Sequence, residues 1–317
     1  MTPGETFPSG EQWTIRHGDH EAVVVQVGGG LRSYTHRGRQ VLAGYPADAK
    51  CSAGRGQLLM PWPNRIRDGK YSLSGRSHQL ALSEPERGNA IHGLVRWAIW
   101  SLLKRNHHDQ DTITLVCRLP PQQGWEWSLD LFITYALTDE GLVVTPRAVN
   151  IGTGTAPFGV GAHPYLSVGE VSVDEVVLGI PARSLLEVDD RLLPTGLTTV
   201  DGTGLDFREP RLLGETMLDT AFTDVAPDAD GRWRVTLACS PSADTPTGRA
   251  VTVWADATAY PWLQVFTGDS LPSGARRTSG VAVEPMTCAP DAFNSGDGLL
   301  LLEPRQEFTA SWGITPG

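Results

Sequence analysis

The strongest constraint on the fold is an alternation of apolar and mostly polar residues between positions 127 and 138. Successive side chains of a β-strand point to opposite faces, so a period of two predicts a strand with one buried face. The alternation runs into Thr138-Asp139-Glu140-Gly141 and then into an apolar segment, which predicts a hairpin. The same parity recurs at positions 113–119, 233–239 and 308–314.

Helical periodicity is not sustained anywhere in the 317 residues, which include 35 Gly, 23 Pro and 10 Trp. A chain of this length forms two ordinary domains or one large all-β unit. Turn residues recur throughout instead of marking one linker. We therefore expect residues 1–317 to form a single all-β domain, a large antiparallel β-sandwich.

The triple glycine at positions 28–30 follows a strand-like segment, residues 21–27. A glycine-rich loop that binds phosphate is followed by a helix, with GxGxxG or Walker spacing. Neither is present here, so we expect a turn between two strands.

The formal net charge of −10 disfavours nucleic acid as a partner, because an acidic surface repels a polyanion. The N-terminus lacks the charged start and apolar core of an export signal. No apolar run approaches the roughly 18 residues of a membrane-spanning helix. We expect a soluble, cytoplasmic protein, a monomer or a homodimer, with no membrane partner.

The four cysteines, Cys51, Cys117, Cys239 and Cys288, lie far apart in the sequence. No CxxC pair exists, and no histidine lies at metal-ligand spacing from any of them. Without an export signal, disulfides are not expected. We therefore expect reduced, mostly buried thiols and no metal.

Two side chains suited to proton transfer, His163 and Glu284, each directly precede a proline. The proline ring disfavours the helical region for the preceding residue, so both backbones are expected to be extended. An acid and a base held in this way can move protons without a cofactor.

Five further polar residues are candidates for a binding site: Asn64, Arg65, His92, Asp219 and Gln264. Asn64 and Arg65 follow a proline-bounded tryptophan and offer amide and guanidinium groups that suit sugar hydroxyls. Gln264 and Asp219 lie in apolar runs, where a buried polar group needs partners. The alternatives are a structural histidine, a solvated loop at Arg65 and a turn or cap at Asp219.

In their order along the chain, these motifs resemble those of the aldose 1-epimerase (mutarotase) family. The resemblance spans residues 61–294, with strand-like segments before and after, and implies a twisted antiparallel β-sandwich. Within that family, the sequence most resembles the bacterial branch of sulfoquinovose mutarotase-like proteins, through residues 63–71, 91–96 and 284–294. The motifs that carry the resemblance are Asn64-Arg65, His92-Gly93, His163-Pro164-Tyr165, Asp219, Gln264 and Glu284.

Converting one aldose anomer into the other requires removal of the proton from the anomeric hydroxyl and protonation of the ring oxygen. Glu284 is expected to be the base, because an ordinary glutamate is ionised at neutral pH. His163 is expected to be the acid, kept charged by an anionic neighbour such as Glu284. Both roles agree with those that the resemblance implies. His92 is expected to hydrogen-bond near the ring oxygen and to share in proton transfer.

Asn64, Arg65, Asp219 and Gln264 are expected to hold the sugar hydroxyls, with no metal and no other cofactor. Either Trp62 or Trp262 is a candidate to lie along an apolar face of the sugar, and core packing is the alternative for both.

Two other functions remain open from the sequence. One is a mutarotase of a sulfonated or phosphorylated sugar, whose anion would need an arginine such as Arg65, Arg67 or Arg96. The other is a non-catalytic carbohydrate-binding module on the same fold. A binding module has no need of a matched acid and base, so His163 and Glu284 favour an isomerase.

Overall fold

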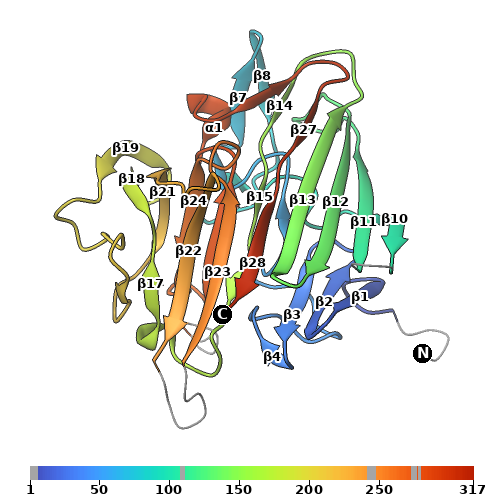
Figure 1. Cartoon of the computed structure of the whole chain (residues 1–317). Coiled ribbons are helices and arrows are strands. Elements are labelled where there is room, and N and C mark those ends of the chain that lie inside the picture. The colour runs from blue at the N-terminus through green and yellow to red at the C-terminus, as the bar shows by residue number, and fades with distance from the viewer. Residues whose placement is uncertain (1–5, 108–110, 241–247, 273–276, 278–279) are drawn as a thin grey trace.

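A computed structural model describes residues 6–107, 111–240, 248–272, 277 and 280–317. Within these residues the regular secondary structure is almost entirely antiparallel β-strand (Figure 1). The described helical segments are one turn of 3₁₀ helix, η1 (Val173–Glu175), and one short α-helix, α1 (Ala292–Ser295). The expected all-β class is confirmed.

The larger of the two main sheets has ten described strands. Nine form a continuous path, and β27 (Glu307–Thr309) pairs with β13 beside that path. The path, in order, is β10 (Ser101–Asn106), β11 (Thr112–Leu119), β12 (Leu129–Thr138), β13 (Gly141–Asn150), β28 (Trp312–Pro316), β23 (Arg249–Asp256), β22 (Arg232–Cys239), β17 (Val177–Gly179) and β20 (Arg211–Leu212).

The second main sheet has eight described strands, and β16 (Tyr165–Leu166) pairs with β25 beside its path. The path, in order, is β19 (Pro194–Thr199), β18 (Ala182–Val188), β21 (Asp219–Val225), β24 (Trp262–Phe266), β25 (Val281–Met286), β15 (Gly161–Ala162) and β5 (Leu58–Leu59).

Smaller sheets complete the described part of the chain. The N-terminal one consists of β1 (Gln12–His17), β2 (His20–Val25), β3 (Leu31–His36) and β4 (Arg39–Gln40). The two-stranded ones pair β6 (Arg65–Arg67) with β9 (Asn89–Ile91), β7 (Lys70–Leu73) with β8 (Arg76–Gln79), and β14 (Ala156–Phe158) with β26 (Leu300–Leu302).

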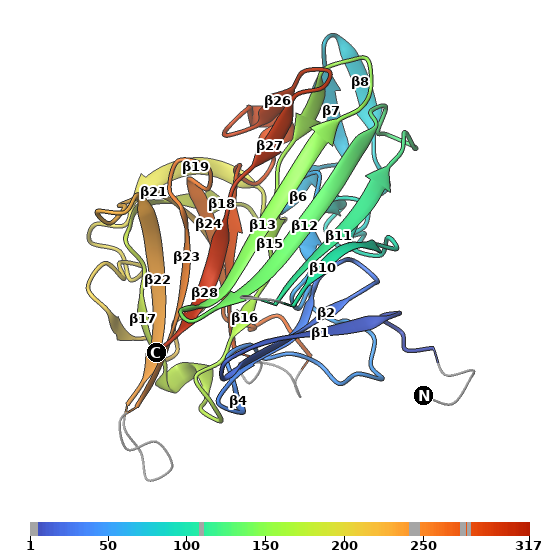
Figure 2. The ribbon, with the colours of Figure 1, turned by 45° about the vertical axis from the view of Figure 1, so that its right-hand side comes forward.

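The two main sheets pack face to face, as the views in Figures 1 and 2 show. Their facing side chains belong to one buried apolar cluster, which includes Leu131 of β12, Val265 of β24 and Val283 of β25. β12 alternates strictly between buried and partly exposed residues, as its sequence period requires. β25, in contrast, is buried at all six positions. Any polar group on β25 therefore lies in the interior.

The local predictions agree with the structure at the turns. The predicted hairpin joins β12 to β13, with Thr138 opposite Gly141. Gly28 and Gly29 form a turn between β2 and β3, and both have positive φ. A side chain at Gly29 would collide with the ring of Trp100, 2.7 Å from the added Cβ. The triple glycine therefore serves chain reversal and close packing.

All four cysteines are free, and three of them are buried, while Cys51 is partly exposed. This agrees with the expectation of reduced thiols. No helix within the described residues is long and apolar enough to cross a membrane.

Candidate active site

A cavity of about 170 Å³ opens beside the β21–β24–β25 part of the second sheet. It is smaller than the roughly 300–1,000 Å³ of pockets for drug-sized ligands, which favours a small ligand. Strand register explains its floor, because Gln264 of β24 lies opposite Glu284 of β25. Phe266 lies two residues farther along β24 and pairs with Asp219 of β21, so these four side chains share one face.

His163 enters the cavity from the short connection between β15 and β16. Its Nε2 lies 3.3 Å from Oε1 of Glu284, and both side chains are almost fully buried. Tyr165 stacks on the His163 ring at 5.0 Å and donates its hydroxyl hydrogen to the carbonyl of Ala53. The packing against Tyr165 fixes the ring that faces Glu284.

Burial shifts the pKa of both His163 and Glu284 in the direction of the neutral form. It lowers the pKa of His163 to about 3, and the nearby Arg96 acts in the same direction. Burial raises the pKa of Glu284 well above its ordinary value, with a further contribution from the charge of Asp219. Burial therefore disfavours both the charged His163 and the ionised Glu284 that the sequence led us to expect.

His92 reaches the cavity from the end of β9, opposite Asn64 at the start of β6. The backbone amide of His92 donates to the backbone carbonyl of Asn64 at 2.8 Å, and the backbone amide of Asn64 donates to His92 Nδ1 at 3.2 Å. Both residues have positive φ, 54° for Asn64 and 62° for His92. Gly93 follows, also at positive φ, where an added Cβ would lie 1.9 Å from the Met60 carbonyl oxygen. This reversal turns the imidazole toward His163, with ring centroids 5.5 Å apart.

A chain of amide hydrogen bonds joins this reversal to the sheet floor. Asn64 Nδ2 donates to Gln264 Oε1 at 3.3 Å, and Gln264 Nε2 donates to Asp219 Oδ1 at 2.6 Å. Each amide is oriented by the bond that it gives and the bond that it receives. This series of hydrogen bonds ends on the Asp219 carboxylate, whose second oxygen is left as an acceptor at the cavity.

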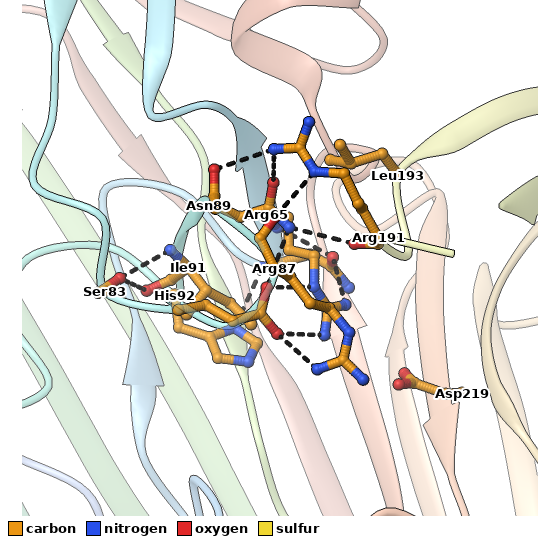
Figure 3. A network of polar contacts seen from close by, with 12 residues as sticks. Arg65, Ser83, Arg87, Asn89, Ile91, His92, Arg191, Leu193 and Asp219 are labelled. Carbon is orange, nitrogen blue, oxygen red and sulfur yellow. Dashed lines mark hydrogen bonds and ion pairs between the residues drawn. The ribbon is translucent and has the colours of Figure 1, made fainter. Parts of the chain in front are cut away.

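Arg65 is held by a residue that the sequence analysis did not select, Glu84. Arg65 donates to both Glu84 oxygens at 2.9 Å, and Asn89 and Arg87 donate to the same carboxylate at 3.0 and 3.3 Å. Burial alone would raise the pKa of Glu84, but its bonds with Arg65, Asn89 and Arg87 hold that pKa below its ordinary value. Figure 3 shows this network, with Arg191 donating to Asn89 and with Asp219 apart from the network, on β21 of the second main sheet.

All seven residues singled out from the sequence line the cavity: Asn64, Arg65, His92, His163, Asp219, Gln264 and Glu284. Neither candidate tryptophan does, because Trp62 and Trp262 are buried in packing. The aromatic side chains at the cavity are Tyr165 and Phe266.

Of the arginines considered for an anion, Arg65 lines the cavity, whereas Arg67 lies near Asp189 and Asp291 and Arg96 lies outside the lining. The second arginine at the cavity is Arg87. Glu84 and Arg87 carry one sequence signal, because Glu84 precedes Pro85 as Glu284 precedes Pro285. That signal alone is insufficient, since Glu209 and Glu303 also precede prolines and do not line the cavity.

One donor set at the cavity has the composition of a metal site. One ring nitrogen from each of His92 and His163 and a carboxylate oxygen of Glu284 lie within 4.8 Å of one another. Two histidines and a carboxylate suit a divalent transition metal.

Comparison with known proteins identifies the architecture and its family. The family model described as aldose 1-epimerase matches residues 11–315. The chain belongs to the aldose 1-epimerase family. Among its relatives, the uncharacterised protein YihR of Escherichia coli (strain K12) is 36% identical over 296 residues, which cover 93% of this chain and 90% of that protein. The galactose mutarotase of Sus scrofa is 27% identical over 271 residues, covering 79% of this chain and 75% of the relative.

This aldose 1-epimerase family member also shares its fold with solved structures. A galactose mutarotase-like protein from Clostridium acetobutylicum superposes with a TM-score of 0.84 at 20% identity, covering 99% of this chain and 97% of the other. The resemblance drawn from short motifs is thereby confirmed, as is the β-sandwich that it implied. The chain is an enzyme of the isomerase class, of the mutarotase type.

Proposed function

We propose that this enzyme interconverts the α and β anomers of a free aldose, with His163 and Glu284 as its proton carriers. The observation that carries the proposal is their buried contact, 3.3 Å between Nε2 and Oε1, at the wall of a small cavity. A buried acid and base in contact are costly to a fold that does not use them. We further propose that the chain acts as one domain, since a single apolar cluster includes both Ile15 and Ile314.

Burial raises the pKa of Glu284 and lowers that of His163, which favours a proton on Glu284 before the reaction begins. When a sugar fills the cavity, its hydroxyl groups donate hydrogen bonds to Glu284, which favour the carboxylate, and the proton passes from the Glu284 carboxyl to His163. Glu284 then accepts the proton of the anomeric hydroxyl while His163 protonates the ring oxygen. The bond between the anomeric carbon and the ring oxygen breaks, and an open-chain aldehyde forms. Rotation of the aldehyde and the reverse proton transfers close the ring as the other anomer.

The remaining cavity residues would orient the sugar. The free oxygen of Asp219 accepts a hydrogen bond from a hydroxyl, while Arg65, Asn64 and Gln264 are held in place by their own partners. Such orientation contributes to rate, because proton transfer requires reacting atoms within hydrogen-bond distance. His92 lies beside His163 and would contact the ring oxygen.

The test is anomer exchange measured by magnetisation transfer or polarimetry with the wild-type protein and glucose, galactose, xylose, a hexose 6-phosphate and sulfoquinovose. We expect accelerated exchange of at least one of these sugars. Binding of a sugar without acceleration would instead support a carbohydrate-binding module. Absence of both would overturn the proposal.

Arg87 supports a second candidate, a mutarotase whose sugar carries a sulfonate or phosphate group. Arg87 and Arg65 together bring two positive charges to Glu84, which supplies one negative charge. Arg65 is paired through two nitrogens, whereas Arg87 touches Glu84 through one nitrogen at 3.3 Å and is 36% exposed at the cavity. Its guanidinium therefore has donors to offer an anionic substituent.

Replacing Arg87 with alanine separates the two candidates. An exposed ion pair contributes about 1 kcal/mol, so a charged substrate would lose roughly fivefold in kcat/KM and a neutral hexose would lose less than twofold. Arg76→Ala is the control, because Arg76 forms an exposed ion pair with Glu126 away from the cavity. Equal effects of Arg87→Ala on neutral and anionic sugars would rule out the anionic candidate.

A further inference from the structure

The two histidines at the cavity differ in what their second ring nitrogen meets. A neutral imidazole has one nitrogen that donates and one that accepts. The Asn64 backbone amide can only donate, and it points at His92 Nδ1 at 3.2 Å. Nδ1 of His92 must therefore be the acceptor, which puts the ring hydrogen on Nε2. His163 has no such partner: its Nδ1 is buried without a hydrogen bond, and its Nε2 faces Glu284.

The backbone makes the contact with Asn64 a permanent feature of the site. β6 and β9 pair in register, with Arg65 opposite Ile91, and one residue beyond this pair the His92 backbone amide donates to the Asn64 carbonyl. Both residues have positive φ, and the Asn64 backbone amide donates to the imidazole of His92 instead of to a backbone carbonyl of the facing strand. Gly93, which fits only without a side chain, then fixes where the reversal occurs.

We propose that the Asn64 amide holds His92 in the Nε2-protonated tautomer, so that His92 is a fixed hydrogen-bond donor to the sugar, whereas His163 alone exchanges protons with Glu284. The donor role rests on the proposed mutarotase function, but the tautomer does not. Asn64 is in this respect a positioning residue that acts through its backbone. The sequence suggested shared proton transfer, and this geometry separates the two roles.

The same tautomer bears on the metal-like donor set. A ligating imidazole must present a nitrogen without a hydrogen. In His92 that nitrogen is Nδ1, which is already occupied by the Asn64 amide. Coordination through Nε2 would require the hydrogen to move to Nδ1, against the N–H of Asn64. The set formed with His163 and Glu284 therefore lacks its third ligand.

Tautomers are observed directly by two-bond ¹H–¹⁵N correlation in protein labelled with ¹⁵N-histidine. We expect His92, assigned through its hydrogen bond to the Asn64 amide, to show an unprotonated Nδ1 and a protonated Nε2 from pH 6 to 9. Asn64→Gly keeps the amide and suits positive φ, so it should keep this tautomer. A protonated Nδ1, or a mixture of tautomers in either protein, would overturn the proposal.

Kinetics test the donor role separately. His92→Gln places an amide donor near the Nε2 position without a titrating group, and we expect kcat/KM within about tenfold of wild type. His92→Leu should lose about 10- to 100-fold, as for removal of one donor, and His163→Gln about 10²- to 10⁴-fold, as for removal of a proton carrier. A folded His92→Gln enzyme as slow as His163→Gln would refute the donor role. A wild-type protein that exchanges no sugar would sink the proposed function and the donor role, while the tautomer would still be decided by the NMR experiment.

Discussion

Glu84→Gln is the change that most sharply tests how the cavity is held together. The carboxylate accepts two hydrogen bonds from Arg65 and one each from Asn89 and Arg87. Glutamine has nearly the same shape, but it keeps one acceptor oxygen and places an amide donor where the other oxygen was. That donor would face the guanidinium of Arg65, which also can only donate.

The magnitude follows from burial and from the charges left behind. The Glu84 and Arg65 side chains are only 11% and 9% exposed, so water replaces little of what is lost. Removing one partner from a fully buried ion pair costs about 3–5 kcal/mol. Because Glu84→Gln keeps one acceptor, we expect the free energy of unfolding to fall by about 3 kcal/mol. Arg65 would also lose its fixed orientation, which should raise KM severalfold more than it lowers kcat.

Urea unfolding with linear extrapolation measures the first effect, and anomer exchange over a sugar concentration series measures the second. Glu209→Gln is the matched control, since it changes another glutamate before a proline, at an exposed position away from the cavity. The pKa of Glu84 is lowered by folding, so its contribution is present above the ordinary pKa of a glutamate and is lost as pH falls through the lowered value. A loss below 0.5 kcal/mol at pH 7 with unchanged KM would refute this reasoning.

Arg65→Ala should raise KM with a smaller effect on kcat, and unchanged kinetic constants for every accepted sugar would remove Arg65 from the site. Gly93→Ala should prevent stable folding, because its Cβ would lie 1.9 Å from the Met60 carbonyl oxygen; a wild-type thermal unfolding midpoint would contradict this steric argument. His163 should reduce stability as pH decreases below about 6.5, because the fold lowers its pKa to about 3 and the unfolded chain then binds the extra proton, whereas Glu284, whose pKa is raised, acts in the opposite direction. Replacing His163 with glutamine should weaken that acid-side slope by up to about 1.4 kcal/mol per pH unit, and an identical slope would contradict a neutral His163.

The strands could be predicted because the alternation of apolar and polar residues is visible in consecutive positions of the sequence. β12 shows this most directly, with alternating burial from Leu129 to Thr138. The register between strands that are distant in sequence does not follow from the local pattern of residues. The sequence therefore did not reveal that Gln264 lies opposite Glu284. It also did not reveal that Asp219, paired with Phe266, lies on the same face of the sheet.

Charge state was the least predictable property. Neighbouring opposite charges favour ionisation and burial disfavours it, and the sequence does not show how deeply the fold buries His163 and Glu284. Glu84 was missed for a related reason. Its role depends on Arg65, which is 19 residues away in sequence and becomes its partner only through the pairing of β6 with β9.

Anomer exchange by the Glu284→Gln variant tests the central claim most directly. The glutamine keeps the shape of the side chain and removes its capacity to carry a proton, so exchange of the best sugar should fall by about 10²- to 10⁴-fold. The variant should remain folded and at least as stable at neutral pH, because the buried Glu284 carboxyl has a raised pKa and costs stability above its ordinary pKa. Sugar binding should be largely retained. A folded variant that exchanges anomers at close to the wild-type rate would show that Glu284 is not the base.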